Sequence, residues 1–275
     1  MSVRVQKDVS YRDPVQPSHS LDLYFPTTTP SDKLLPLVVF VHGGAWRSED
    51  KAHHADLANK LVEQTHLPVA VVNYRLTTPT THLHHPAHAE DVLAALQFLH
   101  TANPHADYDV NRIYLMGHSC GAHILSSIFL DSSATTPSLT PTPTLVTAVQ
   151  AIIVSEGIYD IDVLLRSFPD YREWFIADTF SERDSYADVS VTSFPLRENG
   201  AHIRWLVIQS PGDKLIDILQ AQTFFDHLVS LHRASGSESF LRFDKTTFTQ
   251  NHNDVLKEEG FARTVADYIE PLYRI

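Results

Sequence analysis

A serine flanked by glycines lies where a buried strand is predicted to pass into a helix. The residues are Gly117-His118-Ser119-Cys120-Gly121, directly after the apolar run 113–116 and before a helical pattern that begins at Ala122. A sharp strand-to-helix turn strains the backbone of its central residue and exposes that residue's hydroxyl, and glycines let neighbouring chain approach. The pattern predicts that Ser119 is a nucleophile. An incidental serine in a turn is the alternative, and the flanking strand and helix argue against it.

A second glycine motif, His42-Gly43-Gly44-Ala45-Trp46, follows the apolar run 37–41. Backbone N–H groups that point into a site stabilise the oxyanion of a tetrahedral intermediate, and glycines allow the backbone to turn that way. We predict an oxyanion hole made by the N–H groups of Gly43, Gly44 and Cys120. A plain turn at the end of a strand is the alternative for this pentapeptide taken alone.

A serine hydroxyl becomes an effective nucleophile when a histidine, oriented by a carboxylate, takes its proton. Behind a serine turn of this kind the order along the chain is Ser, Asp, His. Asp213 lies in the loop after the apolar run 205–208, and His252 lies between the last predicted strand and the final helix. We therefore predict a Ser119, Asp213, His252 triad. Asp217, at the start of the next helical pattern, is the competing acid.

Two further residue patterns suggest other chemistry. Residues 82–88 are rich in histidine, whose neutral imidazole binds zinc, but a loop interrupted by proline does not fix a metal's geometry. We interpret these residues as a surface loop and expect no metal and no other cofactor. Cys120 is expected to be a small buried residue and not a catalytic thiol, because Ser119 holds the centre of the turn.

The candidate residues need a scaffold, which the apolar pattern supplies. Short β-branched runs alternate with segments of helical period, as is typical of an α/β fold with a mostly parallel sheet and helices on both faces. Central strands are expected at residues 37–41, 69–72, 113–116, 149–154 and 205–208, with flanking strands at 1–10, 21–25 and 240–243. Helices are expected at 55–62, 91–99, 122–130, 219–231 and 254–269.

Two segments interrupt the alternation. Residues 132–147 are rich in Ser, Thr and Pro and are predicted to be an exposed connection. Residues 159–199 carry many aromatic side chains among charged ones, which suits a small cap beside a pocket. A flat apolar wall suits an aryl substrate, and the predicted substrate-binding residues are Trp46, Tyr159, Phe168, Tyr171 and Trp174, with Phe175 beside them. The alternative is that these aromatic residues only pack a core.

Composition limits the class of protein. The chain has 275 residues, 43% of them hydrophobic, and we read residues 1–275 as one domain. Its 33 acidic against 21 basic residues give a net charge of -12, which disfavours nucleic acid as a partner. No stretch approaches the ~18 to 20 apolar residues that span a bilayer. The single cysteine excludes an intrachain disulfide, and we expect a cytoplasmic protein that does not contact membranes.

The motifs resemble those of the eukaryotic, fungal-type kynurenine formamidases (arylformamidases) of the α/β-hydrolase superfamily. The pentapeptide His42 to Trp46 matches their HGGxW oxyanion loop, as distinct from the HGGG of many related esterases. The resemblance covers most of residues 37–269, with the Ser/Thr/Pro-rich stretch and parts of the cap unmatched. It includes the serine turn and the segments Gly157-Ile158-Tyr159-Asp160, Phe168-Pro169-Asp170-Tyr171 and Asn251-His252-Asn253-Asp254-Val255. Cys120 departs from the Ala or Val of many relatives, which leaves its backbone donor intact.

The resemblance implies an α/β-hydrolase fold and hydrolysis of N-formyl-L-kynurenine to L-kynurenine and formate, in tryptophan catabolism and NAD biosynthesis. A carboxylesterase of broad acyl specificity and a non-catalytic relative that binds a small molecule are the alternatives. The expected partner is a small aryl formamide. The sequence leaves open whether the chain forms a homodimer and which groups bind the amino-acid end of such a substrate.

Overall fold

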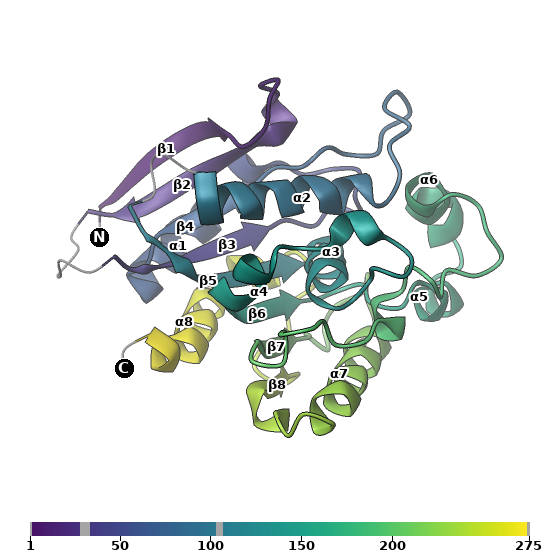
Figure 1. Ribbon diagram of the computed structural model, residues 1–275. Coiled ribbons are helices and arrows are strands. Elements are labelled where there is room, and N and C mark those ends of the chain that lie inside the picture. Colours follow the sequence, from purple (N-terminus) through teal and green to yellow (C-terminus); the bar gives the residue numbers. More distant parts are fainter. Residues whose placement is uncertain (1, 28–33, 103–106, 274–275) are drawn as a thin grey trace.

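The computed structural model describes residues 2–27, 34–102 and 107–273, and it contains an eight-stranded sheet in the order β1-β2-β4-β3-β5-β6-β7-β8 (Figure 1). β2 pairs antiparallel with both β1 and β4, and every other neighbouring pair is parallel. This confirms the predicted mostly parallel sheet; Met1 lies outside the described residues. The strands are β1 (Val3–Ser10), β2 (Ser20–Pro26), β3 (Pro36–Val41), β4 (Val69–Val72), β5 (Asp109–His118), β6 (Val149–Ser155), β7 (Arg204–Ile208) and β8 (Leu241–Asp244).

Helices cover both faces of the sheet, because successive side chains of a buried strand point to opposite sides. Val39 and Val41 belong to one apolar cluster, with residues of α2, α3, α4 and α7, whereas Val38 and Phe40 belong to another, with residues of α1 and α8. The helices are α1 (Ala55–Thr65), α2 (Ala87–Gln97), α3 (Cys120–Phe129), α4 (Pro143–Ala148), α5 (Ile161–Ser167), α6 (Ala177–Phe180), α7 (Ile218–Arg233) and α8 (Glu259–Tyr273). In the described parts of the chain, no helix has the length and apolar character needed to cross a membrane.

The carboxyl ends of β3, β5, β6 and β7 meet at one edge of the sheet, since these strands are parallel. The loops that leave them contain the glycine motif at His42, the Ser119 turn, Glu156 and Asp213. Helices α5 and α6, from the predicted cap, lie beyond the sheet on the side away from both termini (Figure 1). In open α/β sheets this edge is where ligands bind.

Most of residues 132–147 are exposed, as predicted for a connection, but the segment is also anchored by buried apolar residues and ends in a short helix. Leu139, Leu145 and Val146 are buried, and the short helix α4 begins at Pro143. Thr142 caps α4 by accepting a hydrogen bond from the Leu145 N–H, and proline is favoured in a first turn because its missing N–H has no intrahelical partner there. The few apolar residues among the Ser, Thr and Pro therefore suffice to fix the segment against the core.

The starts of two helices, α2 and α8, differ most from the predicted ones. α2 begins at Ala87, four residues before the predicted start, so that His88 is buried in its first turn. The final helix is preceded by a separate 3-10 turn, Val255–Lys257, after which Glu258 is extended. Helix ends depend on local capping, which apolar periodicity does not report.

Candidate functional site

Ser119 occupies a strained turn between β5 and α3. Its φ of 55° lies in the left-handed region, where few residues other than glycine are found, and its N–H donates to the carbonyl of Ser155 at the end of β6 (2.9 Å). Gly121 makes this turn possible, because a Cβ there would lie 2.3 Å from the carbonyl oxygen of Val41. The neighbouring strand β3 therefore passes directly under the start of α3.

The glycine motif after β3 packs on the same turn. A Cβ on Gly43 would lie 2.8 Å from the Cβ of Ser119, so any larger residue would displace the serine. Gly44 has a φ of 95°, and the next two residues, Ala45 and Trp46, also have left-handed φ values of 52° and 58°. The Tyr74 hydroxyl donates to the carbonyls of His42 (3.0 Å) and Gly43 (3.1 Å). The loop is thus held by its carbonyl groups.

The side chain of Cys120 contacts the backbone of the glycine loop and the tyrosine that holds it. Its Sγ accepts a hydrogen bond from the Trp46 N–H (3.2 Å) and lies 3.7 Å from the Tyr74 hydroxyl. Burial raises the pKa of the thiol to about 11, so that the thiolate needed for nucleophilic chemistry does not form near neutral pH. Cys120 is buried, as the sequence predicts, and its side chain holds the loop.

His252 and Asp213 form a close pair. His252 Nδ1 lies 2.7 Å from Asp213 Oδ2, and Asp213 Oδ1 accepts hydrogen bonds from the N–H groups of Leu215 (2.8 Å) and Ile216 (3.1 Å). Burial alone would raise the pKa of Asp213, but hydrogen bonds from His252 and Glu156 outweigh it and lower that pKa. Asp217 instead precedes α7 at the N-cap position. The carboxylate beside the histidine is that of Asp213.

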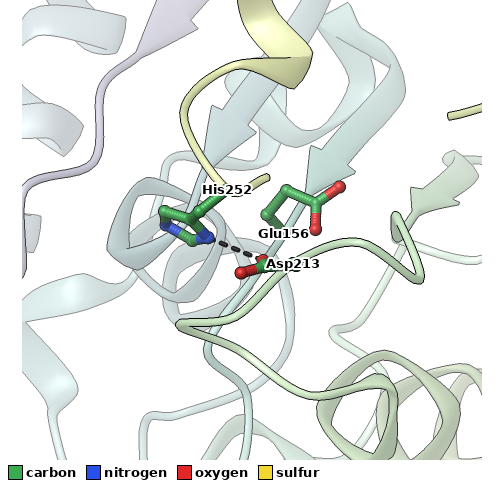
Figure 2. Close-up of side chains that lie close together, drawn as sticks. All are labelled: Glu156, Asp213 and His252. Atoms are coloured by element: carbon green, nitrogen blue, oxygen red, sulfur yellow. Dashed lines mark hydrogen bonds and ion pairs between the residues drawn. The ribbon is translucent and has the colours of Figure 1, made fainter. Parts of the chain in front are cut away.

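Glu156 lies beside Asp213 and is the one residue of the cluster that the sequence reasoning missed (Figure 2). It follows β6, has a left-handed φ of 49°, and is buried. One of its carboxyl oxygens accepts from the Ser210 N–H (2.9 Å) and the other from Gln209 Nε2 (2.7 Å). Burial, together with the adjacent Asp213, raises the pKa of Glu156 to about 10. Glu156 is therefore protonated at neutral pH and donates a hydrogen bond to Asp213.

The imidazole of His118 packs beside that of His252, with 4.8 Å between the ring centroids. Its Nδ1 lies 3.0 Å from the Ser155 hydroxyl and its Nε2 lies 3.3 Å from Asn253 Oδ1. Burial lowers the pKa of His118 well below its usual value, and the nearby His252 adds to this effect. His118 is thus neutral, and it fixes one side of His252 without adding a charge.

Ser119 and His252 line a common cavity of about 330 Å³. Of the predicted substrate-binding residues, Tyr171 and Trp174 are in its wall, and Phe168 stacks on Tyr171 from behind with ring centroids 4.9 Å apart. The other lining residues are Gly44, Ala45, Arg47, Ser48, Glu49, Ile158, Phe175, Leu215, Ile216 and Asn253.

Two of the predicted substrate-binding residues lie in the core and not in the cavity wall. Trp46 is fully buried and packs on His123, Phe175 and Phe180. Tyr159 is likewise buried and stacks on Phe224, with ring centroids 4.1 Å apart. Both side chains pack in the core beneath the site. Large aromatic groups occur in protein cores as well as in ligand pockets, so residue type does not predict which place they take. Phe175 takes the wall position next to Tyr171.

Glu156, Asp213 and His252 are also the residues in the described part of the chain whose potential metal ligand atoms gather within 4.8 Å of one another. The carboxyl oxygens of Glu156 and Asp213 and the Nδ1 of His252 already have hydrogen-bond partners, and a protonated Glu156 is a poor ligand for a cation. The histidines of residues 82–88 face separate partners, with His84 against the carbonyl of Asp178 and His88 against the Thr77 hydroxyl. The surface-loop interpretation fits the exposed His82 and His84 but not the buried His88.

The model of the BD-FAE family matches residues 21–228, which include β2 to β7 and most of α7. The chain belongs to the BD-FAE family. This BD-FAE protein is similar to esterase B of Lactobacillus rhamnosis, with a TM-score of 0.75, 16% identity, and coverage of 98% of this chain and 85% of that one. The likeness confirms the α/β-hydrolase fold.

Two groups of curated relatives resemble this BD-FAE protein. A kynurenine formamidase of the yeast Meyerozyma guilliermondii is 28% identical over 196 residues, covering 70% of this chain and 70% of the relative. An isoprenylcysteine alpha-carbonyl methylesterase of Arabidopsis thaliana is 32% identical over 179 residues, covering 64% of this chain and 40% of the relative. Family and relatives together make the BD-FAE protein a hydrolase of the α/β-hydrolase esterase type.

The raised pKa of Glu156 predicts a pH-dependent stability. Between about pH 5 and 9 the folded protein holds a proton on Glu156 that the unfolded chain has released, so this residue lowers the free energy of unfolding as pH rises. Glu156→Gln removes the titration and keeps a donor toward Asp213. In denaturant unfolding, the free energy of unfolding of the variant, minus that of the wild type, should increase by up to about 1.4 kcal/mol per pH unit. The exposed Glu198→Gln is the control, and a flat difference for Glu156→Gln would refute a protonated Glu156.

Proposed function

We propose that the protein is a serine hydrolase that cleaves the formamide of N-formyl-L-kynurenine to give L-kynurenine and formate. The observation that carries the proposal is the cavity in which Ser119 and His252 lie together under an aromatic wall, with Asp213 bonded to the histidine. The formyl group is the smallest acyl group and needs little space, whereas the leaving aryl group needs a flat apolar surface such as Tyr171, Trp174 and Phe175 offer.

In the proposed first half-reaction, Ser119 Oγ attacks the formyl carbon as His252 takes its proton. The hydrogen bond at Nδ1 assigns the protonated nitrogen of the neutral imidazole and leaves Nε2 as the acceptor. The N–H groups of Gly43, Gly44 and Cys120 would stabilise the oxyanion, each such donor being worth about 3 to 4 kcal/mol. His252 then returns the proton to the arylamine, which leaves as L-kynurenine, and a formyl ester remains on Ser119.

In the second half-reaction, water attacks the formyl ester. His252 again accepts a proton, this time from the water, and passes it to Ser119 Oγ as the C–O bond breaks. Formate leaves and the enzyme returns to its starting state. Asp213 stabilises the imidazolium in both halves, and the protonated Glu156 keeps Asp213 oriented without competing as an anion.

The yeast relatives support this choice of substrate, because three of them, at 25 to 28% identity, are named kynurenine formamidases. A carboxylesterase is the second candidate, and it is favoured by the plant methylesterases and by the esterases of similar structure. A formamide and a small ester form similar tetrahedral intermediates, so both reactions fit one site. A non-catalytic relative that binds a small ligand is the third candidate, and the complete set of candidate catalytic residues speaks against it.

If Asp213 and not Asp217 is the acid of the triad, two similar substitutions should have a large and a small effect on kcat. Asp213→Asn should lower kcat by about 10³-fold or more, because the histidine loses the anion that orients and stabilises it. Asp217→Asn should change kcat by less than about threefold, since this residue stands at a helix start. Steady-state kinetics on one substrate, with unfolding curves to confirm that both variants fold, checks this. The reverse ranking would assign the acid to Asp217.

The identity of the substrate predicts a ratio of specificity constants. Wild-type kcat/KM for N-formyl-L-kynurenine should exceed that for p-nitrophenyl acetate by about tenfold or more, because the larger substrate fills the aromatic cavity. Ser119→Ala supplies the background rate for both. A higher kcat/KM for the ester would favour the carboxylesterase, and no turnover of either substrate would favour the binding protein.

A further inference from the structure

The candidate active-site cavity contains a pair of opposite charges that the proposed mechanism does not use. Arg47 and Glu49 follow the glycine motif directly and line the same cavity as Ser119. They are the fully charged side chains among the residues that line this cavity, whose other side is aromatic and aliphatic. Within the described ranges no ion pair joins one to the other.

We propose that Arg47 binds the α-carboxylate and Glu49 the α-ammonium of an aryl amino acid, so that the cavity selects zwitterionic substrates. The proposal deepens the proposed function, on which its choice of an aryl amino acid rests. N-formyl-L-kynurenine carries a formamide on its ring and an amino-acid group at the end of a short side chain. A cavity with a nucleophile, an aromatic wall and two opposite charges complements each of these parts.

Arg47 is oriented before any ligand binds. Its Nη1 donates a hydrogen bond to the main-chain carbonyl of Trp174 and lies 4.0 Å from a carboxylate oxygen of Asp178. The Asp178 side chain is 60% exposed, and such surface ion pairs contribute little. A guanidinium has five N–H donors in a fixed plane and binds carboxylates through two of them. The contact with Trp174 fixes the plane while donors remain for a ligand.

Glu49 is positioned by its backbone and by two histidines. Its φ of 81° is left-handed, and its Oε2 lies 3.0 Å from His53 Nδ1 and 3.6 Å from His54 Nε2. Burial lowers the pKa of His54 to about 4, so this imidazole is neutral at neutral pH and does not cancel the charge of Glu49. Glu49 borders both the Ser119 cavity and a neighbouring cavity that His53 and His54 line, so its carboxylate is accessible to an ammonium group in the first.

The two charges do not suit the competing substrates. A simple acyl ester has no charged group to pair with either residue. The Arg47 and Glu49 side chains are 31% and 34% exposed, and an apolar ligand would displace water from both without replacing its hydrogen bonds. A zwitterion satisfies both residues at once. Specificity of this kind is strong, because an analogue that lacks the partner group leaves a protein group unpaired.

Direct binding tests the proposal without requiring turnover. Isothermal titration calorimetry should give a Kd for L-kynurenine about tenfold or more below that for 2-aminoacetophenone, which keeps the aryl ketone but lacks the amino-acid group. Arg47→Gln should abolish this preference, and Arg47→Lys should restore part of it. The exposed Arg166→Gln, which removes a positive charge away from the cavity, should keep the full preference.

A third ligand separates the two residues. Desamino-kynurenine, 3-(2-aminobenzoyl)propanoate, keeps the carboxylate and lacks the ammonium. Arg47→Gln should weaken the binding of both acids by about tenfold or more, whereas Glu49→Gln should weaken only that of L-kynurenine. The exposed Glu198→Gln is the matched control for the second variant.

Equal losses for 2-aminoacetophenone and L-kynurenine in the Arg47 variants would overturn the proposal and assign Arg47 a structural role toward Trp174. A wild type that does not distinguish the two ligands would also overturn it. The proposed function fails separately: if the wild type shows the preference but does not cleave N-formyl-L-kynurenine, the zwitterion site stands and the formamidase assignment does not.

Discussion

The contact between the start of α3 and the end of β3 is the constraint on which the candidate site depends. Gly121 lies so close to the carbonyl of Val41 that no Cβ fits between them, and a Cβ on Gly43 would collide with that of Ser119. These approaches bring the glycine loop of one strand onto the serine turn of the next. The left-handed backbone of Ser119 is the cost of this arrangement, and the packing of β5 and α3 between neighbouring elements holds it.

A buried polar network then fixes the histidine. Glu156, Asp213 and His252 come from three different loops. Burying any one of these side chains without its hydrogen-bond partners would be unfavourable. One proton shared between two carboxyl groups leaves a single negative charge, placed on the group that contacts the histidine. The histidines beside the site, His42 and His118, are kept neutral by burial and so do not compete for that charge.

The sequence predicted those parts of the site that are defined by local geometry. The serine turn, the glycine loop and the order of strands and helices follow from glycine spacing and apolar period, and the fold that they predict is the one found. Glu156 was not predicted, because an acidic residue after a strand is common and its role depends on a neighbour 57 positions away, at Asp213. Trp46 and Tyr159 are predicted to contact the substrate but lie in the core, because residue type alone does not distinguish a cavity wall from a core.

Labelling of the intact protein with a fluorophosphonate tests the central claim most directly, because the reagent forms a stable adduct with a serine only when a neighbouring base has activated it. The account predicts one adduct per chain, located by peptide mass spectrometry on Ser119, and its loss in His252→Ala. An adduct on another residue, or undiminished labelling of Ser119 without His252, would contradict it.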